Sequence, residues 1–276
     1  MISDLKNDII PYIGESLPYV FVPEKVILND DYTIETEIVG LDVENKNFAN
    51  LLKVLSSLGS CNLYKMLHDR SQEKIYFLGE KLRIRKLSYN RSTSFSVSCK
   101  SVLESKRKGK SYLHVKELVS KELLYTFELD YYIISKSAFE SIYKNYFDDR
   151  PVEFYDESLP ESRITVESDN CFSIFVDPFT PHQCKGHFEN FPVVPAVFIT
   201  NRILKEIFTF LGNHEFQEVD SLEMYLTKAM PTGKEFVIEV SHQRFLRDIA
   251  NFKCEVKDAT GNTYGIYIIN TYTRAH

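Results

Sequence analysis

The sequence lacks the features that mark membrane, secreted and nucleic-acid-binding proteins. No segment approaches the ~20 apolar residues that cross a bilayer. The N-terminal segment carries acidic side chains and no long apolar core, so it is not a signal peptide. The formal net charge of −6 gives no reason to expect nucleic acid as the main partner. We therefore expect a cytoplasmic protein with no membrane span and no nucleic-acid partner.

Cysteine is also sparse, with five residues of which no two form a Cys-x-x-Cys pair. The odd number favours reduced thiols over a disulfide framework. A chain of 276 residues buries about three quarters of its unfolded surface, so it needs neither disulfides nor metals to fold. The histidines show no metal-ligand spacing, and we predict no metal and no cofactor.

The sequence does contain many segments that are rich in Tyr, Val, Ile and Phe and are separated by charged turns. Such segments predict antiparallel strands. These lie at 33–41, 74–87, 94–105, 111–118 and 123–134, and again at 162–168, 172–177, 221–230, 236–245, 250–258 and 263–273. Apolar residues at steps of three and four predict long helices over 47–67 and 195–212, and 137–149 reads as a short helix.

Each half of the chain therefore has the same order: a strand, one long helix, then a run of antiparallel strands. The boundary falls near Arg150, dividing the chain into domains 1–149 and 150–276. In an α+β unit with one long helix, the helix is best buried if the antiparallel sheet wraps around it. Two such units side by side would join their edge strands and hide them.

The stretch GHFENFPVVPAV, residues 186–197, carries the candidate chemistry. A histidine with a near-neutral pKa suits proton abstraction, and here His187 precedes two prolines and a helix start. Pro192 and Pro195 stiffen the approach. The unpaired N–H groups at a helix start suit an oxygen that gains negative charge. An apolar groove beside the helix would take an apolar chain.

This stretch resembles the signature of the 3-hydroxyacyl-acyl-carrier-protein dehydratases, which have the hotdog fold. That signature reads Gly-His-Phe, three residues, Pro, two residues, Pro-Gly-Val, and only its last glycine differs here, as Ala196. The resemblance covers roughly 157–276, and LPYVFVPEKVIL (17–28) looks like the family's opening segment. It implies a double hotdog, in which a joined antiparallel sheet wraps two long central helices. The 1–149 unit has no recognisable active-site motif.

The resemblance also implies roles for residues. His187 would be the base, the N–H groups of Ala196 and Val197 would polarise the thioester carbonyl, and Gly186 and Phe188 would position the site. The family's helix acid falls at Asn201, which cannot donate a proton as an acid and would instead orient a water or the hydroxyl.

Other residues stay open as candidates. Asn50 and Lys53, at the matching positions of the first helix, are not acidic either. Asp177 is the first alternative proton donor, or else caps a turn, and Glu189 is the second, or else faces solvent. His182 has the His-x-x-x-Gly spacing to Gly186 that polyketide dehydratase domains carry. Basic hairpins that would dock an acidic carrier protein, or else are solvated tips, contain Lys106, Arg107, Lys108, Arg244 and Arg247.

Three functions follow. The first is dehydration of a 3-hydroxyacyl thioester on acyl carrier protein, in fatty acid or polyketide-type synthesis. The alternative is a non-catalytic subunit that binds an acyl chain or carrier protein, or another hotdog subunit, and the missing helix acid favours it. The third is an acyl thioesterase, ranked last because hydrolysis needs a carboxylate and its usual helix position has none. We expect a monomer or a homodimer.

Overall fold

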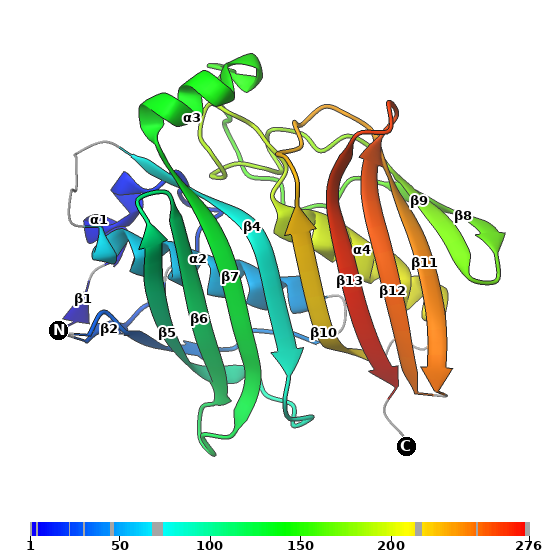
Figure 1. The fold of residues 1–276 in the computed structure, drawn as a ribbon, viewed down its shortest axis with the longest axis horizontal. Helices are drawn as coiled ribbons and strands as arrows, with labels where there is room; N and C mark the ends of the chain where they lie inside the picture. Colours follow the sequence, from blue (N-terminus) through cyan, green and yellow to red (C-terminus); the bar gives the residue numbers. More distant parts are fainter. Residues whose placement is uncertain are drawn as a thin grey trace.

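A single antiparallel sheet carries both halves of the chain (Figure 1). The computed structural model describes residues 2–3, 5–21, 23–29, 31–44, 47–67, 74–212, 217–246 and 248–273. The first half contains β1 (Ile2–Ser3), α1 (Leu5–Asp8), η1 (Ile10–Tyr12), β2 (Val26–Leu28), β3 (Ile34–Val39), α2 (Phe48–Met66), β4 (Ile75–Lys86), β5 (Ser94–Ser105), β6 (Lys108–Glu117) and β7 (Leu123–Ser135). After α3 (Lys136–Ile142) and η3 (Lys144–Tyr146), the second half contains β8 (Ser162–Ser168), β9 (Cys171–Val176), α4 (Ala196–Leu211), β10 (Gln217–Leu226), β11 (Phe236–Leu246), β12 (Ile249–Asp258) and β13 (Thr263–Thr273).

The two halves repeat one topology. The strand order is β1-β2-β3-β5-β6-β7-β4-β10-β13-β12-β11-β9-β8, so β3, β5, β6, β7 and β4 match β9, β11, β12, β13 and β10. The halves join where β4 pairs with β10, over Lys81–Arg85 and Ser221–Tyr225. The expected division at Arg150 falls in the segment between η3 and β8.

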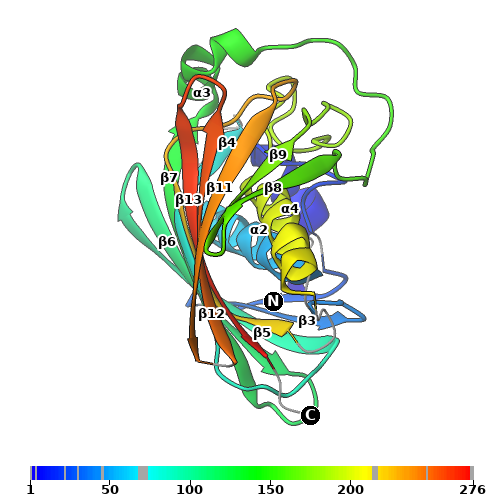
Figure 2. The same ribbon diagram turned by 90° about the vertical axis from the view of Figure 1, so that its right-hand side faces the viewer.

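The sheet curves around α2 and α4, which lie on its concave face (Figure 2). Most residues of α2 are buried, because this helix packs against β5, β6 and β7 on one side and α4 on the other. Buried side chains of both helices belong to one continuous hydrophobic core that extends through both halves. The predicted arrangement, with two long helices wrapped by one joined sheet, is therefore confirmed. No helix in the described part of the chain is long and apolar enough to cross a membrane.

The N-terminal segment is the part for which the sequence predicted no structure. After η1 it makes one isolated bridge within the first half, between Ile13 and Ile75, and one to the second half, between Glu15 and His187. The backbone N–H of Gly14 also donates to the Ile75 carbonyl, at 2.8 Å. These contacts hold residues 13–16 between the start of β4 and the loop that carries the Gly-His-Phe motif.

Candidate active site

His187 lies buried with one ring nitrogen held by the backbone. Its Nδ1 is 3.0 Å from the carbonyl oxygen of Val193. A carbonyl only accepts, so Nδ1 carries the proton and Nε2 has the free lone pair. Val193 is itself fixed, since it bridges to Pro231 and its neighbour Val194 donates to the Met230 carbonyl. The loop therefore presents His187 as an oriented base.

A carboxyl group from the other half of the chain lies beside that base. Glu15 Oε1 is 3.9 Å from His187 Nε2. The backbone N–H of Ser16 donates to the Gly186 carbonyl at 2.7 Å, and this bond holds the two segments side by side. Glu15 is a candidate acid that the sequence analysis does not identify.

Gly186 makes this approach possible. Its φ is +90°, and a Cβ there would lie 2.6 Å from the Ser16 carbonyl oxygen and 2.8 Å from the Tyr19 nitrogen. Both contacts are with backbone, which cannot move aside locally. The glycine of the motif is thus required so that the segment carrying Glu15 can pass against the histidine loop.

Burial shifts the pKa values of the pair in opposite directions. It raises the pKa of Glu15 from 4.5 to about 7, although the positive charge of Lys53 acts the other way. It lowers the pKa of His187 from 6.5 to about 4. Near neutral pH the histidine is therefore neutral, and a large share of Glu15 is protonated. The two side chains form an acid and a base rather than an ion pair.

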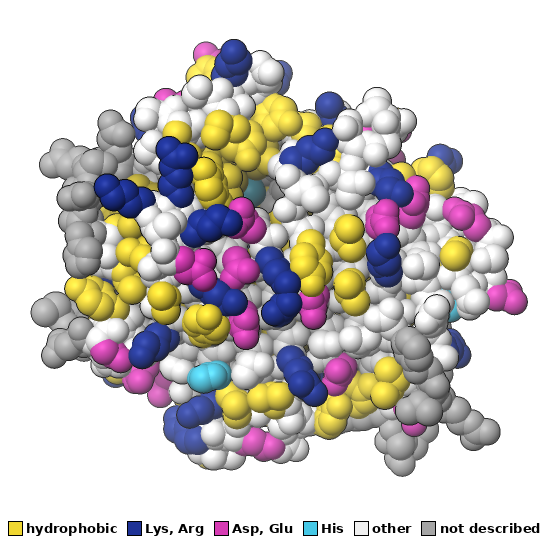
Figure 3. Space-filling model, viewed as in Figure 1, with side chains coloured by type: hydrophobic (Ala, Val, Ile, Leu, Met, Phe, Trp, Pro, Cys, Tyr) yellow, Lys and Arg dark blue, Asp and Glu magenta, His cyan; other side chains and the backbone are white. Residues whose placement is uncertain are grey.

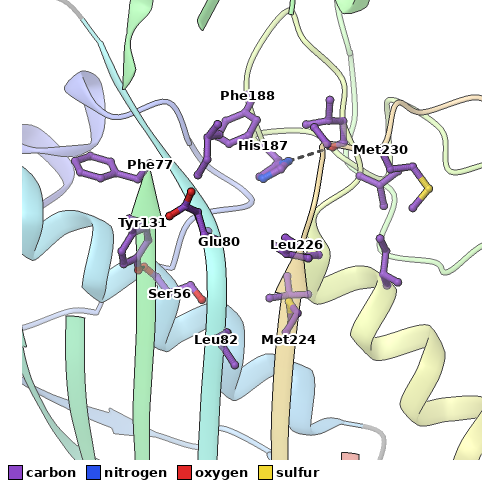
Figure 4. Close-up of a pocket in the computed structure, with 18 of the residues that line it drawn as sticks. Ser56, Phe77, Glu80, Leu82, Tyr131, His187, Phe188, Met224, Leu226 and Met230 are labelled. Atoms are coloured by element: carbon purple, nitrogen blue, oxygen red, sulfur yellow. Dashed lines mark hydrogen bonds between the residues drawn. The ribbon is translucent and has the colours of Figure 1, made fainter. Parts of the chain in front are cut away.

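The pair lies at the head of a cavity of about 260 Å³. The cavity walls are mainly apolar: Phe77, Leu82, Met224, Leu226 and Met230 are drawn in Figure 4. The cavity extends from His187 along α2 and α4 beneath β4 and β10. It can hold an extended apolar chain with its reacting end at His187.

The mouth of the cavity lies between the two halves. Pairing of β4 with β10 ends at Lys81 and Tyr225, and beyond that point the strands separate. Glu80, at a bulge in β4, and the exposed Lys228 line the cavity there. Figure 3 shows this face of the molecule, with a hollow below a group of hydrophobic side chains.

The start of α4 contributes to the same cavity. Ala196 and Val197 both line it. The first helical bonds run from Phe198 and Ile199 to the Pro195 carbonyl, so the N–H groups of Ala196 and Val197 have no acceptor among the described residues. These N–H groups and the positive end of the helix suit an oxygen that gains negative charge.

Phe188 anchors the motif loop. Its φ is +56°, a conformation that costs free energy for a residue with a side chain. The ring packs edge-on against Tyr76 and Phe139, at centroid distances of 5.6 and 5.2 Å, in a cluster that also contains Phe191. This packing holds the strained residue, and with it the neighbouring His187.

The structure places the other candidate acids and Asn201 away from His187. Asn201 lines a second cavity of about 300 Å³, together with Asn50 and Lys53. Asp177 does not line the His187 cavity, and its N–H donates to the Glu161 carbonyl. Glu189 is exposed and pairs with Lys74 at 3.1 Å. The expectation that Asn201 or Asp177 works beside His187 therefore has no geometric support.

His182 is placed away from the cavity as well. Its Nδ1 is 3.3 Å from the Phe154 carbonyl oxygen, and its ring stacks on that of Phe154 at 4.2 Å. It does not line the cavity that contains His187.

The basic hairpins lie at opposite ends of the sheet. Lys106, Arg107 and Lys108 are exposed at the β5–β6 turn, and Lys108 Nζ is 3.3 Å from Glu80 Oε2 at the cavity mouth. Arg244 is exposed too, but it pairs with Ala250 at the end of the sheet remote from Leu226 and the mouth. Arg247 lies outside the described residues.

The matching place in the first half, at the start of α2, holds no comparable cavity among the residues that the structure describes. Only about 20 Å³ is open there, between Phe48, Lys86 and Glu218. Lys86 and Glu218 form a buried ion pair, and the Tyr272 hydroxyl donates to Glu218 at 2.9 Å. Ionic side chains fill the position that corresponds to the His187 cavity of the second half.

The described residues contain no group of three or more His, Cys, Asp or Glu side chains that could hold a metal ion. The cavity offers acid–base groups and backbone donors as its chemistry.

Comparisons with solved structures identify the fold. No family model and no curated protein matches the chain by sequence. A 12:0-ACP thioesterase from Umbellularia californica aligns with a TM-score of 0.58 and 8% identity, over 88% of this chain and 95% of that one. An acyl-ACP thioesterase from Bacteroides thetaiotaomicron gives 0.54 and 14%, over 88% and 98%, and an acyl-CoA thioesterase II from Mycobacterium marinum 0.54 and 10%, over 91% and 96%.

Identities this low show the fold alone. All three proteins bear the name of thioesterases, so the comparisons do not support the dehydratase family that the motif resembles. They do support, together with the single large antiparallel sheet, one structural conclusion: the chain has a hotdog-type fold.

Proposed function

We propose that this chain is a double-hotdog enzyme that dehydrates 3-hydroxyacyl thioesters. The observation that carries the proposal is the pairing of His187 with Glu15, 3.9 Å apart at the head of an apolar cavity. Dehydration needs a neutral base and a protonated acid at the same time. The depressed pKa of His187 and the raised pKa of Glu15 supply both near neutral pH.

In the proposed reaction, His187 Nε2 removes a proton from the carbon next to the thioester carbonyl. The N–H groups of Ala196 and Val197 stabilise the enolate oxygen that develops. The C–O bond at carbon 3 then breaks, and Glu15 protonates the departing hydroxyl, which leaves as water. The proton on His187 passes to the Glu15 carboxylate and restores both groups.

Acyl carrier protein is the proposed carrier of the thioester. Its acyl arm would enter where β4 and β10 separate, and the exposed Lys106, Arg107 and Lys108 at that end suit an acidic carrier. Arg244 lies at the other end of the sheet and does not suit it. One chain supplies both residues of the pair, so a monomer is sufficient for the reaction.

Thioester hydrolysis is the second candidate. The sequence ranks it last because the usual helix position holds no carboxylate, but Glu15 brings a carboxyl group beside His187 from outside the helix. The names of the similar structures favour it as well. In this reaction the ionised Glu15 would take a proton from the attacking water. The main argument for the non-catalytic hypothesis is weaker, since a carboxyl group does lie beside His187, although not on the helix.

Intact-mass measurement on carrier proteins separates these functions. The chain is incubated with 3-hydroxyacyl and with unsubstituted acyl carrier proteins of equal length. Loss of one water from the hydroxyacyl carrier alone supports dehydration, whereas release of the acyl chain from both supports hydrolysis. Binding of the carrier without either change would leave the non-catalytic hypothesis. The pH dependence gives a second criterion, because ionisation of Glu15 above about pH 7 slows dehydration and speeds hydrolysis.

A further inference from the structure

Tyr267, on β13, is a polar group in the cavity that the proposed reaction does not use. Its side chain is fully buried, and it lines the cavity that contains His187. The hydroxyl is buried and has no hydrogen-bond partner among the described residues. A buried hydroxyl without a partner is costly, so its presence points to a ligand group that bonds to it.

Three other hydroxyls of the cavity wall are bonded within the protein. The Tyr131 hydroxyl donates to the Ser56 carbonyl at 2.8 Å, and the Tyr264 hydroxyl donates to Asp258 at 3.0 Å. Ser60 donates to the Ser57 carbonyl at 3.0 Å. Tyr267 differs from these three in having no such bond to the described residues.

The position of Tyr267 places it beside the path of the acyl chain. It pairs with Met224 across β10 and β13, and its ring runs back towards Gly265, where a Cβ would lie 3.3 Å from Cε2. Gly265 in turn pairs with Leu226. Met224 and Leu226 are cavity-wall residues that lie beyond His187 in Figure 4. A chain whose reacting end is at His187 therefore runs towards Tyr267 with its distal part.

We propose that Tyr267 binds an oxygen on the distal part of the acyl chain, so that the preferred substrate is a thioester oxygenated beyond its reacting carbons, by a hydroxyl or keto group. This inference rests on the proposed function in that it takes the occupant of the cavity to be an acyl chain. A plain alkyl chain would leave the Tyr267 hydroxyl unpaired in the complex, whereas an oxygenated chain satisfies it.

The test uses acyl-pantetheine amides, in which nitrogen replaces the thioester sulfur so that neither reaction proceeds. Hexanoyl, octanoyl and decanoyl chains are each prepared with a terminal methyl and with a terminal hydroxyl group. Calorimetric titration of the full chain should show, at one length, about tenfold tighter binding of the hydroxylated form, the effect of one neutral hydrogen bond. The Tyr267→Phe variant should lose this preference. Tyr264→Phe is the matched control and should keep it, because its hydroxyl bonds to Asp258.

Equal binding of both forms at every length, or a preference that survives Tyr267→Phe, would overturn the inference, as would failure of every amide to bind. Without ligand, the Tyr267→Phe variant should melt at the same temperature as the wild type or a higher one. A large fall in melting temperature would show that the Tyr267 hydroxyl has a hydrogen-bond partner within the protein, and it would also overturn the inference. The binding result does not depend on turnover. The proposed function fails separately, in the intact-mass assay.

Discussion

Replacement of Glu15 by glutamine tests the acid of the proposed site most directly. Glutamine keeps the size of the side chain but cannot supply the proton that the leaving hydroxyl needs. Because acid–base catalysis contributes ~100- to 10,000-fold, kcat should fall by that order. KM should change little, since glutamine keeps the size of the side chain and the apolar residues of the cavity wall are unchanged. Formation of the enoyl thioester, followed by its ultraviolet absorbance, measures both quantities.

The same variant should alter stability in a pH-dependent way. The pKa of Glu15 is raised in the folded protein, so the stability that this group contributes is fully present below pH 4.5 and is lost as the pH rises through about 7. The difference between 4.5 and about 7 corresponds to ~3 kcal/mol. The glutamine side chain cannot ionise, so the variant avoids this loss. The free energy of unfolding of Glu15→Gln, relative to wild type, should therefore rise by up to that amount between acid and alkaline pH.

Urea unfolding at both ends of this pH range measures the change, and Glu189→Gln is the control. Glu189 is two residues from His187 but exposed and paired with Lys74, so its substitution should affect neither turnover nor stability. Wild-type turnover by Glu15→Gln would refute the role of the acid. An equal stability difference at acid and alkaline pH would refute the argument that burial raises the pKa of Glu15.

Three further outcomes are expected. The dehydration rate of the wild type should fall below about pH 4, where His187 becomes protonated, and above about pH 7, where Glu15 ionises; a pH–rate profile without the upper limb would contradict the assignment. Gly186→Ala should reduce turnover by at least ~10-fold and lower the melting temperature, because its Cβ would lie 2.6 Å from the Ser16 carbonyl oxygen and push Glu15 away. Asn201→Glu should not raise kcat in the same assay, because residue 201 lines the second cavity rather than that of His187; a large gain would show that the helix position can still serve the reaction.

The elements that the sequence predicted well are those with a local period. The strand predicted over 94–105 coincides with β5, and the helix predicted over 47–67 differs from α2 by one residue at each end. Alternation along β5 and steps of three and four along α2 are properties of neighbouring residues, which a sequence displays directly. The join of the two sheets followed from the need to cover edge strands.

The acid of the site could not be predicted in the same way. Glu15 belongs to a segment with no periodic pattern, and it reaches His187 through one isolated bridge from the far half of the chain. The close approach that allows the bridge depends on Gly186. The motif contains this glycine, but it does not indicate which segment packs against it. Asn201, by contrast, lies at a fixed spacing from the motif, because the motif ends at the start of the same helix. A contact between segments that are distant in the sequence has no fixed residue spacing from which it could be predicted.

The two halves share one topology but differ in the space at the start of their long helices. At the start of α4 the sheet leaves room for a cavity and for His187, whereas at the start of α2 the buried Lys86–Glu218 pair occupies the matching space. The first half supplies Glu15 and part of the cavity wall to the site of the second. The acid and the base of the proposed pair come from different halves, so the joined sheet is what makes the site complete.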